Sequence, residues 1–311
     1  MTSFSIVVCA YNAAARIGET LRYLALLRYP VNQFEIIVVD NNSNDATSDI
    51  ALGTWRTLNS DFSFRIVVEE AQGLSNARKR GIFESKGEYI VFCDDDNWLG
   101  AEYLKHADET LAGRKDIGVL GGQGIPVTDA DAFPNWFYTY ANDFGVGVQA
   151  MQSGDISGRG YVWGAASIIR RKPLIDSFLG GCEFLLSGRK GSSLASGDDS
   201  ELCKWFLIAG YRLWYDERLT FRHFIPRQRL TLDYLARLNH GIKESTRILA
   251  EYDQWLQRAH ARARFNTFPV RWIMSEIRYK IRSTAERPVV KALASKLDRA
   301  NSPRPAYLDV R

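Results

Sequence analysis

The chain has 311 residues, of which 46% are hydrophobic and 24% charged, as in ordinary soluble globular proteins. No run approaches the roughly 20 apolar residues of a membrane span, and the N-terminus does not predict a signal peptide. Residues 1–200 hold 18 Lys/Arg against 25 Asp/Glu, and residues 201–311 hold 22 against 11. This asymmetry favours either an anionic partner for the basic part or arginine-rich, solvated helix faces.

The four cysteines show neither CxxC pairing nor zinc-site spacing. We therefore expect reduced, buried thiols and a cytoplasmic protein.

Four short apolar runs predict strands near the N-terminus, at residues 5–9, 35–39, 65–68 and 88–93. Their continuous Val and Ile content is typical of a parallel sheet that is covered on both faces. Helical patterns separate them: one from Ile17 to Leu27, one from Ile50, and one at residues 75–85 with Ser75 as its N-cap. This alternation predicts a doubly wound α/β fold.

Polar residues follow each predicted strand, and the carboxyl ends of parallel strands form the usual ligand crevice. The most acidic of these ends is Asp94-Asp95-Asp96, directly after a buried run. Three neighbouring carboxylates favour a Mg²⁺ or Mn²⁺ site with substrate phosphates. The alternative is a helix cap, in which residues 95–97 begin a helix near Ala101.

The chain after Asp96 is less regular. We predict a strand and turn at residues 118–124, an aromatic stretch at 133–144, and a loop leading into a strand at 158–171. A glycine- and serine-rich loop at 187–197 precedes a helix from Asp199 that stops at Gly210. Two strands at 212–215 and 219–224 follow, and the chain is mostly helical from Thr231.

Seven motifs in order carry a specific resemblance: SIVVCAYN, IIVVDNNSNDAT, QGLSNARKRGI, GEYIVFCDDDNWL, YVWGAASIIRR, SGDDSEL and FRHFIPRQRLT. Together they cover about residues 4–230, and they resemble the inverting glycosyltransferases of family 2. The resemblance implies a GT-A type, Rossmann-like, mainly parallel sheet flanked by helices at residues 1–230, with a helical C-terminal extension at 231–311. It also implies a nucleotide-sugar donor (a UDP- or GDP-sugar), Mn²⁺ or Mg²⁺, and no nucleic-acid partner.

By this resemblance the nucleotide is bound by residues at the strand ends and in the third helix: Ala10, Tyr11, Asn12, Asp40, Asn42, Gly73, Arg78, Asp94 and Asp95. Carboxylates suit the base and ribose because they accept from ring N–H groups and hydroxyls. Two alternatives stay open. Asp40 and Asn42 could form an Asx turn, and Arg78 could buttress the aspartates or lie exposed on its helix.

Asp96 matches the metal-binding acid of the family's DxD motif, and His223 matches an additional metal ligand, although a lone histidine at a strand end is often structural. Arg227 and Arg229 follow closely and are expected to neutralise the diphosphate. Trp163 and Gly164 match the loop that shapes the donor-sugar pocket. Which of Asp94 and Asp95 faces the ribose stays open.

Asp198 and Asp199 match the family's acidic pair, with Asp198 in place of the usual Glu. The second acid, Asp199, would be the general base that deprotonates the acceptor hydroxyl. The alternative is a capping-box-like role for Asp198 with Glu201.

The sequence thus predicts an inverting glycosyltransferase of glycan, polysaccharide or cell-surface polymer biosynthesis, with a glycan or lipid-linked acceptor. Two rivals are a non-catalytic carbohydrate-binding or scaffold protein and a sugar-1-phosphate nucleotidyltransferase. The second expects a glycine-rich nucleotide loop after the first strand, where this chain has AYNAAARIGET. Residues 265–311 hold 10 Lys/Arg against 4 Asp/Glu, so this segment is expected either to contact the inner face of a membrane peripherally or to form a packing or dimer interface.

Overall fold

The structure is a computed structural model that describes residues 1–190 and 194–262. The first 94 residues contain four strands: β1 (Phe4–Ala10), β2 (Phe34–Asp40), β3 (Ser63–Val68) and β4 (Tyr89–Asp94). They pair in parallel in the order β3-β2-β1-β4. All four predicted strands are confirmed, each within two residues of its expected bounds.

The register of these strands brings their carboxyl ends together. Cys9 lies opposite Asp94, Ala10 lies opposite Asp40, and Asp40 lies opposite Val68. The polar residues after each strand therefore meet at one edge of the sheet, as the sequence predicted.

Five further strands complete the described sheet: β5 (Asn97–Leu99), β6 (Ile117–Val127), β7 (Gly154–Asp155), β8 (Ile168–Arg170) and β9 (Arg212–Phe224). Strand β8 lies antiparallel between β4 and β6, β9 runs parallel to β6, and β5 and β7 pair antiparallel with β9. The sheet is mixed: β3-β2-β1-β4 and the pair β6-β9 are parallel, and the other pairings are antiparallel. No α-helix lies between β6 and β8, and a parallel pairing would need such a crossover.

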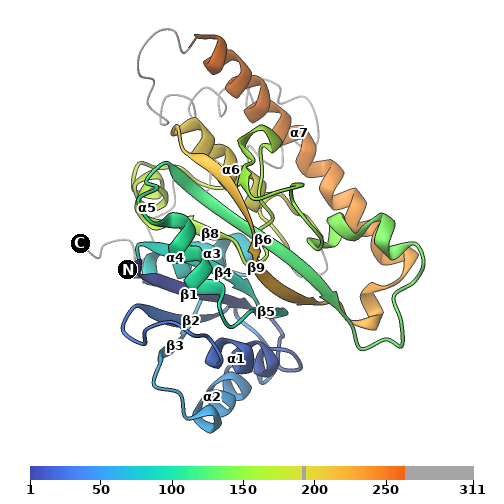
Figure 1. The fold of residues 1–311 in the computed structure, drawn as a ribbon. Helices are drawn as coiled ribbons and strands as arrows, with labels where there is room; N and C mark the ends of the chain where they lie inside the picture. Colours follow the sequence, from blue (N-terminus) through green and yellow to red (C-terminus); the bar gives the residue numbers. More distant parts are fainter. Residues whose placement is uncertain (191–193, 263–311) are drawn as a thin grey trace.

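Helices cover both faces of the sheet (Figure 1). One hydrophobic cluster joins Ile6 and Val8 of β1 to α1 (Ile17–Ala25), α2 (Thr47–Leu58) and α4 (Tyr103–Leu111). The other joins Val7 and Cys9 to α3 (Leu74–Glu84), α5 (Arg171–Leu179), α6 (Asp198–Ile208) and α7 (Leu232–Arg262). Successive residues of β1 are thus buried on opposite faces, which explains its unbroken apolar sequence.

The glycine-rich segment 118–124 does not form the expected turn. It lies within the continuous strand β6, and its glycines permit close neighbours instead. A Cβ atom on Gly122 would lie 1.9 Å from the Leu219 carbonyl oxygen, and one on Gly121 would lie 2.4 Å from Val162 Cγ1. Sequence alone did not separate close packing from a turn.

The two strands expected at 212–215 and 219–224 are one strand, β9. The polar residues between them form a bulge, because Gly121 pairs with Tyr215 whereas Gln123 pairs with Thr220. The backbone N–H and the guanidinium of Arg218 donate hydrogen bonds to the Asp216 carboxylate, and these bonds stabilise the bulge.

The expected helical C-terminal part begins as α7, which extends at the upper right of Figure 1. Its first turns pack on the aromatic stretch 133–144, where Phe137 and Phe144 contact Tyr234 and its neighbours. No helix in the described residues has the length and apolar character to cross a membrane. The basic segment 265–311, including Arg271, Lys280 and Arg282, lies outside the described residues.

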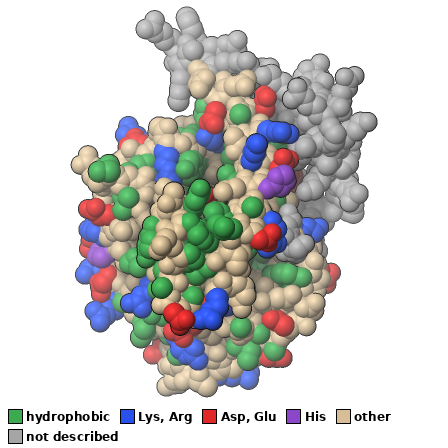
Figure 2. Space-filling view, turned by 90° about the vertical axis from the view of Figure 1, so that its right-hand side faces the viewer, with side chains coloured by type: hydrophobic (Ala, Val, Ile, Leu, Met, Phe, Trp, Pro, Cys, Tyr) green, Lys and Arg blue, Asp and Glu red, His purple; other side chains and the backbone are tan. Residues whose placement is uncertain are grey.

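The described surface carries apolar as well as charged side chains. Figure 2 shows one face of the molecule, with hydrophobic side chains gathered near its middle and Lys, Arg, Asp and Glu around them. All four cysteines are buried, as expected for packing thiols.

Candidate active site

A cavity of about 860 Å³ opens at the carboxyl ends of the strands. It is lined by most of the residues that the sequence singled out: Ala10, Tyr11, Gly73, Arg78, Asp94, Asp95, Asp96, Trp163, Gly164, Asp198, Asp199, His223 and Arg229. Segments far apart in the chain therefore meet at one place, as four strand ends and the start of α6 contribute to the same walls.

Four predicted residues do not line this cavity: Asn12, Asp40, Asn42 and Arg227. Asn12 and Asn42 adopt positive φ angles of 47° and 59° and support the loops after β1 and β2. The amide N–H of Asn44 donates to Asn12 Oδ1 at 3.0 Å, and Asn42 Nδ2 donates to the Glu70 carbonyl at 3.2 Å. Arg227 is exposed and lies near Asp129 and Asp131.

Asp40 holds the loop that leads from β2 into α2. Its Oδ1 accepts from the Ser43 backbone N–H at 3.0 Å, and its Oδ2 accepts from the Ser48 hydroxyl. Asp40 therefore bonds within its own loop, but not as the Asx turn with Asn42, because its side chain accepts from Ser43 and Asn42 donates to Glu70. The neighbouring Asn41 lines the cavity instead, and its Oδ1 accepts from the Gly73 N–H at 2.7 Å.

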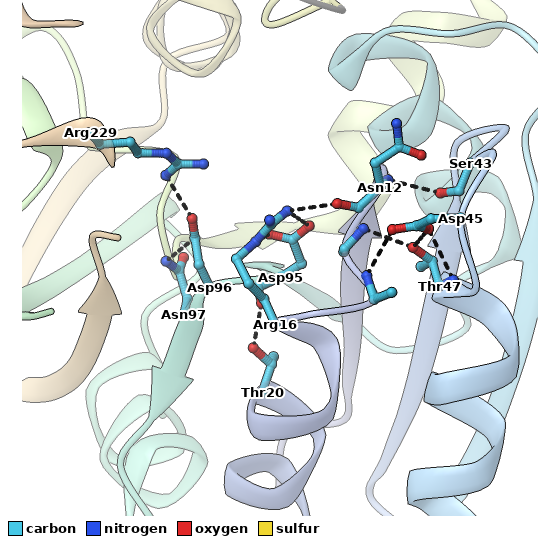
Figure 3. Close-up of polar contacts among 12 residues, drawn as sticks. Asn12, Arg16, Thr20, Ser43, Asp45, Thr47, Asp95, Asp96, Asn97 and Arg229 are labelled. Atoms are coloured by element: carbon cyan, nitrogen blue, oxygen red, sulfur yellow. Dashed lines mark hydrogen bonds and ion pairs between the residues drawn. The ribbon is translucent and has the colours of Figure 1, made fainter. Parts of the chain in front are cut away.

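Asp95 is fixed by the first turn of α1. Arg16 Nη2 lies 2.9 Å from Asp95 Oδ2, and Arg16 Nε donates to Oδ1 at 3.2 Å (Figure 3). The Thr20 hydroxyl donates to the Asp95 carbonyl at 2.7 Å. This forked contact is the usual geometry of an arginine on a carboxylate, and it orders the loop between β4 and β5.

Asp96 lies between two basic side chains from the β9 region. Arg229 Nη1 is 2.9 Å from Asp96 Oδ2, and His223 Nε2 is 3.5 Å from Oδ1 (Figure 3 shows the first contact). The pairing of β5 with β9 causes this arrangement, because Asn97 lies opposite His223 and the Phe224 N–H donates to the Asp96 carbonyl at 2.8 Å.

The three aspartates differ in their electrostatics. Burial raises the pKa of Asp94 to about 6 although Arg78 opposes the rise, and burial and the Asp96 charge also raise the pKa of Asp95. Burial acts on Asp96 too, but His223 and Arg229 outweigh it and hold the pKa of Asp96 below its ordinary value. Asp96 is thus the acid of the three that most firmly keeps its charge.

Arg78 buttresses the acids, which was one of its two expected roles. Its Nη1 lies 2.7 Å from Asp198 Oδ2, its Nη2 lies 3.8 Å from Asp94 Oδ1, and its guanidinium lies 5.2 Å from the centre of the Phe92 ring. With 4% of its surface exposed, Arg78 is not an ordinary surface arginine of α3.

Asp199 is positioned by two backbone N–H groups. Its Oδ2 accepts from Gly164 at 2.7 Å, and its Oδ1 accepts from Ser200 at 2.7 Å. Burial and the adjacent Asp198 raise its pKa, against the opposing effect of Arg78. A raised pKa makes a carboxylate a stronger base, which suits proton abstraction from a hydroxyl.

The capping interpretations do not hold. Helix α6 follows Gly197 and α4 follows Glu102, and neither has a side-chain cap hydrogen bond. Ser75 is likewise not the N-cap of α3, because that helix begins at Leu74 after Gly73.

Glu201 is a fully buried carboxylate with a different structural role. It accepts from the N–H groups of Leu185 and Leu186 at 2.9–3.0 Å and from the Tyr252 hydroxyl at 2.7 Å. Burial raises its pKa to about 7, although these hydrogen bonds oppose the rise. Glu201 therefore ties α6 to α7 and to the segment before residue 187.

Trp163 is largely buried, with 7% of its surface exposed. Its backbone N–H donates to Gln149 Oε1 at 3.0 Å, and the Arg159 guanidinium lies 4.9 Å from the centre of its ring. One ring face is therefore covered by a cation.

The residues present fit a divalent cation at Asp96. An ionised carboxylate and an imidazole face each other there, and burial lowers the pKa of His223 so that a neutral ring nitrogen is available as a ligand. The described residues contain no group of three or more His, Cys, Asp or Glu side chains placed to hold a metal. This agrees with the way Mg²⁺ is commonly held, by one or two protein ligands together with phosphates and water.

Sequence reasoning missed several cavity residues. Arg16 pairs with Asp95, Arg189 lines the wall near the aspartates, and one face of α7 closes the far side. Arg16 follows the AYN motif by four residues, after three alanines. A single cation at this place was the only sequence feature that could have marked it as a site residue. Helix α7 lies outside the recognisable motifs, so its sequence gave no indication that it borders the cavity.

The profile described as "Glycosyl transferase family 2" matches residues 5–178. The chain belongs to this family. Among curated family relatives, the putative glycosyltransferase EpsH of Bacillus subtilis (strain 168) is 32% identical over 113 residues, which are 36% of this chain and 31% of that protein. The poly(ribitol-phosphate) beta-N-acetylglucosaminyltransferase TarS of Staphylococcus aureus (strain Mu50 / ATCC 700699) is 30% identical over 135 residues, 40% of this chain and 23% of TarS. The chain thus spans about a quarter to a third of the length of these two relatives.

Two solved structures share the fold of this family 2 chain. The structure of S. aureus TarS 1–349 in complex with UDP-GlcNAc has a TM-score of 0.55 at 18% identity, over 96% of this chain and 81% of that one. The mannosyltransferase PcManGT from Pyrobaculum calidifontis, in complex with GDP-Man and Mn²⁺, has a TM-score of 0.54 at 17% identity, over 96% and 80%. The expected GT-A fold is therefore confirmed.

Proposed function

We propose that this chain is an inverting glycosyltransferase that moves a sugar from a nucleoside-diphosphate sugar to an acceptor hydroxyl. The observation that carries the proposal is that Asp199, held by the Gly164 N–H at 2.7 Å, lines the same cavity as Asp94, Asp95 and Asp96. A base and a set of acids at a diphosphate site are the two parts that such a displacement needs.

In this reaction Asp199 accepts one proton from the acceptor. The acceptor oxygen attacks the anomeric carbon of the donor while the bond from that carbon to the diphosphate breaks, and Asp199 takes the proton of the attacking hydroxyl. A single displacement of this kind inverts the anomeric configuration. The raised pKa of Asp199 supports this role because it strengthens the base.

The nucleotide side of the proposal follows the family resemblance. Ala10 and Tyr11 would border the base pocket, Gly73 would support the nucleoside, and Asp94 or Asp95 would face the ribose. Asn12, Asp40 and Asn42 do not line the cavity and would act through the loops that they hold. Arg78 would hold the acids in place, since it pairs with Asp198 and lies close to Asp94.

The diphosphate side would involve Asp96, His223 and Arg229, which line the cavity, whereas Arg227 lies outside it. A divalent cation held by Asp96 and His223 would stabilise the negative charge of the leaving diphosphate. Arg229 lies on Asp96 and would add positive charge at the same place. Trp163 and Gly164 would border the donor sugar. UDP- and GDP-sugars are the donors to test, because the neighbours TarS and PcManGT are complexed with UDP-GlcNAc and GDP-Man.

The domain division also stays a proposal, with a GT-A domain at residues 1–230 and an extension at 231–311 that starts with α7. A glycan or lipid-linked acceptor follows the family resemblance, and the name of the relative TarS supports a polymer, poly(ribitol-phosphate), as a further kind of acceptor. Peripheral contact of residues 265–311 with an anionic membrane is supported by their basic composition. Failure of the protein to bind anionic vesicles at low salt would exclude that contact.

The deciding experiment is a panel of UDP- and GDP-sugars with Mn²⁺ or Mg²⁺. We expect one donor to raise the melting temperature in a metal-dependent way and to be slowly hydrolysed in the absence of acceptor. NMR of the transferred sugar should show an inverted anomeric centre. Binding without any turnover would favour the carbohydrate-binding rival, and release of pyrophosphate from a nucleoside triphosphate with a sugar phosphate would favour the nucleotidyltransferase.

A further inference from the structure

The cavity continues beyond the aspartates along α7. Leu238, Ile242, Ser245, Leu249 and Asp253 all line it. They recur every three or four residues, so they share one face of the helix. From the first to the last, the rise of an α-helix gives a wall about 22 Å long. This length leaves room for a second substrate next to a nucleotide sugar.

A pair of cations lies at the Asp253 end of this wall. Lys204 of α6 is an ion-pair partner of Asp253 and has 5% side-chain exposure, whereas Asp253 has 49%. A Cβ atom on Gly160 would lie 2.5 Å from Lys204 Nζ, so the ammonium group contacts the backbone next to Arg159. Lys204 therefore lies against the backbone of the segment that carries Arg159, and its own charge is paired with Asp253.

Arg159 is held in place by aromatic rings and neutral hydrogen-bond acceptors. Its guanidinium lies 4.2 Å from the centre of the Tyr161 ring and 4.9 Å from that of Trp163. Its Nη1 donates to the carbonyl and to Oε1 of Gln149, both neutral acceptors, at 3.1 and 3.0 Å. Within the described residues no Asp or Glu forms an ion pair with it.

Two other arginines of the cavity, Arg16 and Arg229, differ from Arg159 in this respect. Arg16 is paired with Asp95 and Arg229 with Asp96, at 2.9 Å in each case. Stacking on two rings fixes the plane of the Arg159 guanidinium, and within the part of the chain that the structure describes only its Nη1 donates hydrogen bonds. An ordered fork of donors with an unneutralised charge is a site for phosphate or carboxylate oxygens.

This site is adjacent to the base. Trp163, on which Arg159 stacks, is followed directly by Gly164, whose N–H holds Asp199 at 2.7 Å. Lys204 lies on the same helix as Asp199, further from its N-terminus. A group bound at Arg159 would thus belong to a molecule whose hydroxyl can approach Asp199.

We propose that the acceptor is anionic, and that Arg159, with Lys204 beside it, binds a phosphate or carboxylate group of the acceptor. The inference rests on the proposed transferase function and specifies its second substrate. A neutral acceptor would leave the charge of Arg159 without a counterion in a partly enclosed cavity, whereas an anion would form charge-assisted hydrogen bonds with it.

The test measures binding to the complex with UDP, or with GDP if that nucleotide is the one bound. Calorimetry with ribitol 5-phosphate against ribitol, and with glucuronate against glucose, separates a phosphate from a carboxylate. We expect at least one anion to bind about tenfold or more tightly than its neutral counterpart, which is the scale of one or two charge-assisted hydrogen bonds. Equal affinity within both pairs would overturn the proposal without recourse to any variant.

Variants locate the anion site. Arg159→Gln should abolish the preference for the anion and leave nucleotide affinity unchanged, and Arg159→Lys should keep part of it. Arg114→Gln is the matched control, because Arg114 also stacks on an indole, at 3.5 Å from Trp214, but does not line the cavity. An equal loss for the anion and its neutral counterpart in Arg159→Gln would reduce Arg159 to a packing residue and overturn the proposal.

Failure of the inference is distinguishable from failure of the proposed function. If no nucleotide sugar binds or reacts, the transferase proposal fails. If a nucleotide sugar is hydrolysed but only neutral acceptors are bound, the transferase proposal stands and the anionic acceptor is wrong.

Discussion

Arg78 and Asp198 form an ion pair of 2.7 Å in which both side chains are 5% exposed. The pair joins α3 to the first residue of α6, directly before Asp199. Because Arg78 also lies 3.8 Å from Asp94, one guanidinium links the acids after β4 to the acids of α6. The relative position of the two acidic groups therefore depends on this arginine.

Replacing Arg78 by Met should destabilise the fold strongly. The change leaves Asp198 buried without its partner, which typically costs about 3–5 kcal/mol. Arg22→Met is the control, because Arg22 pairs with Glu19 on the surface of α1, where the expected cost is below about 1 kcal/mol. Urea unfolding followed by circular dichroism measures both; similar losses for the two variants would contradict the structural role of the buried pair.

Gly164→Ala should reduce turnover while the protein stays folded. A Cβ atom at this position would lie 2.9 Å from Asp199 Cβ and 2.8 Å from Arg78 Nη2, so the carboxylate must move. We expect kcat to fall about a hundredfold, the scale of misplaced catalytic groups, with nucleotide affinity retained. Gly158→Ala is the matched control, since nothing lies within 4 Å of a Cβ there. Full activity of Gly164→Ala would show that the position of Asp199 tolerates displacement.

Asp199→Asn tests the base itself. The amide is nearly isosteric but does not take up a proton, so transfer should fall by about 10²–10⁴-fold. Binding of the nucleotide, measured by calorimetry, should persist because, in the described residues, the Asp199 carboxylate accepts hydrogen bonds from the Gly164 and Ser200 backbone only. Unchanged turnover would exclude Asp199 as the base.

Asp96→Ala tests the metal assignment. The variant removes the carboxylate that faces His223 and Arg229, so we expect Mn²⁺ to lose its effect on nucleotide affinity. Titration of UDP or GDP with and without Mn²⁺ measures the difference directly. Asp40→Ala is an informative comparison, since its carboxylate holds a loop and should change affinity without changing metal dependence. Retained affinity at saturating Mn²⁺ in Asp96→Ala would count against its role.

The sequence was sufficient for the parts of the site that lie on regular elements. Asp94 and Asp198 follow recognisable apolar or glycine-rich motifs, and parallel pairing brings β1 and β4 into register. Arg16 and Arg159 were not predictable because their roles depend on contacts between segments 79 and 10 residues apart, in which geometry and not residue type decides the partner.

Local propensity also misjudged two segments for a tertiary reason. The glycines of β6 resembled a turn because close approach to Leu219 is invisible in sequence. The polar residues 216–218 resembled a break between strands because their bulge is stabilised by Asp216 and Arg218, which no strand pattern describes.

The buried Glu201 predicts how stability depends on pH. Its pKa is raised from 4.5 to about 7 on folding, so between these values the folded protein binds the proton and the unfolded chain does not. Stability therefore falls as pH rises through this window, and the contribution is about 3 kcal/mol. Glu201→Gln keeps an acceptor for the Leu185 and Leu186 N–H groups but has no charge. Relative to this variant, the wild type should lose stability between pH 5 and pH 8, as measured by urea unfolding at each pH. A difference that is constant with pH would show that Glu201 is ionised throughout, and that its hydrogen bonds to Leu185, Leu186 and Tyr252 outweigh burial.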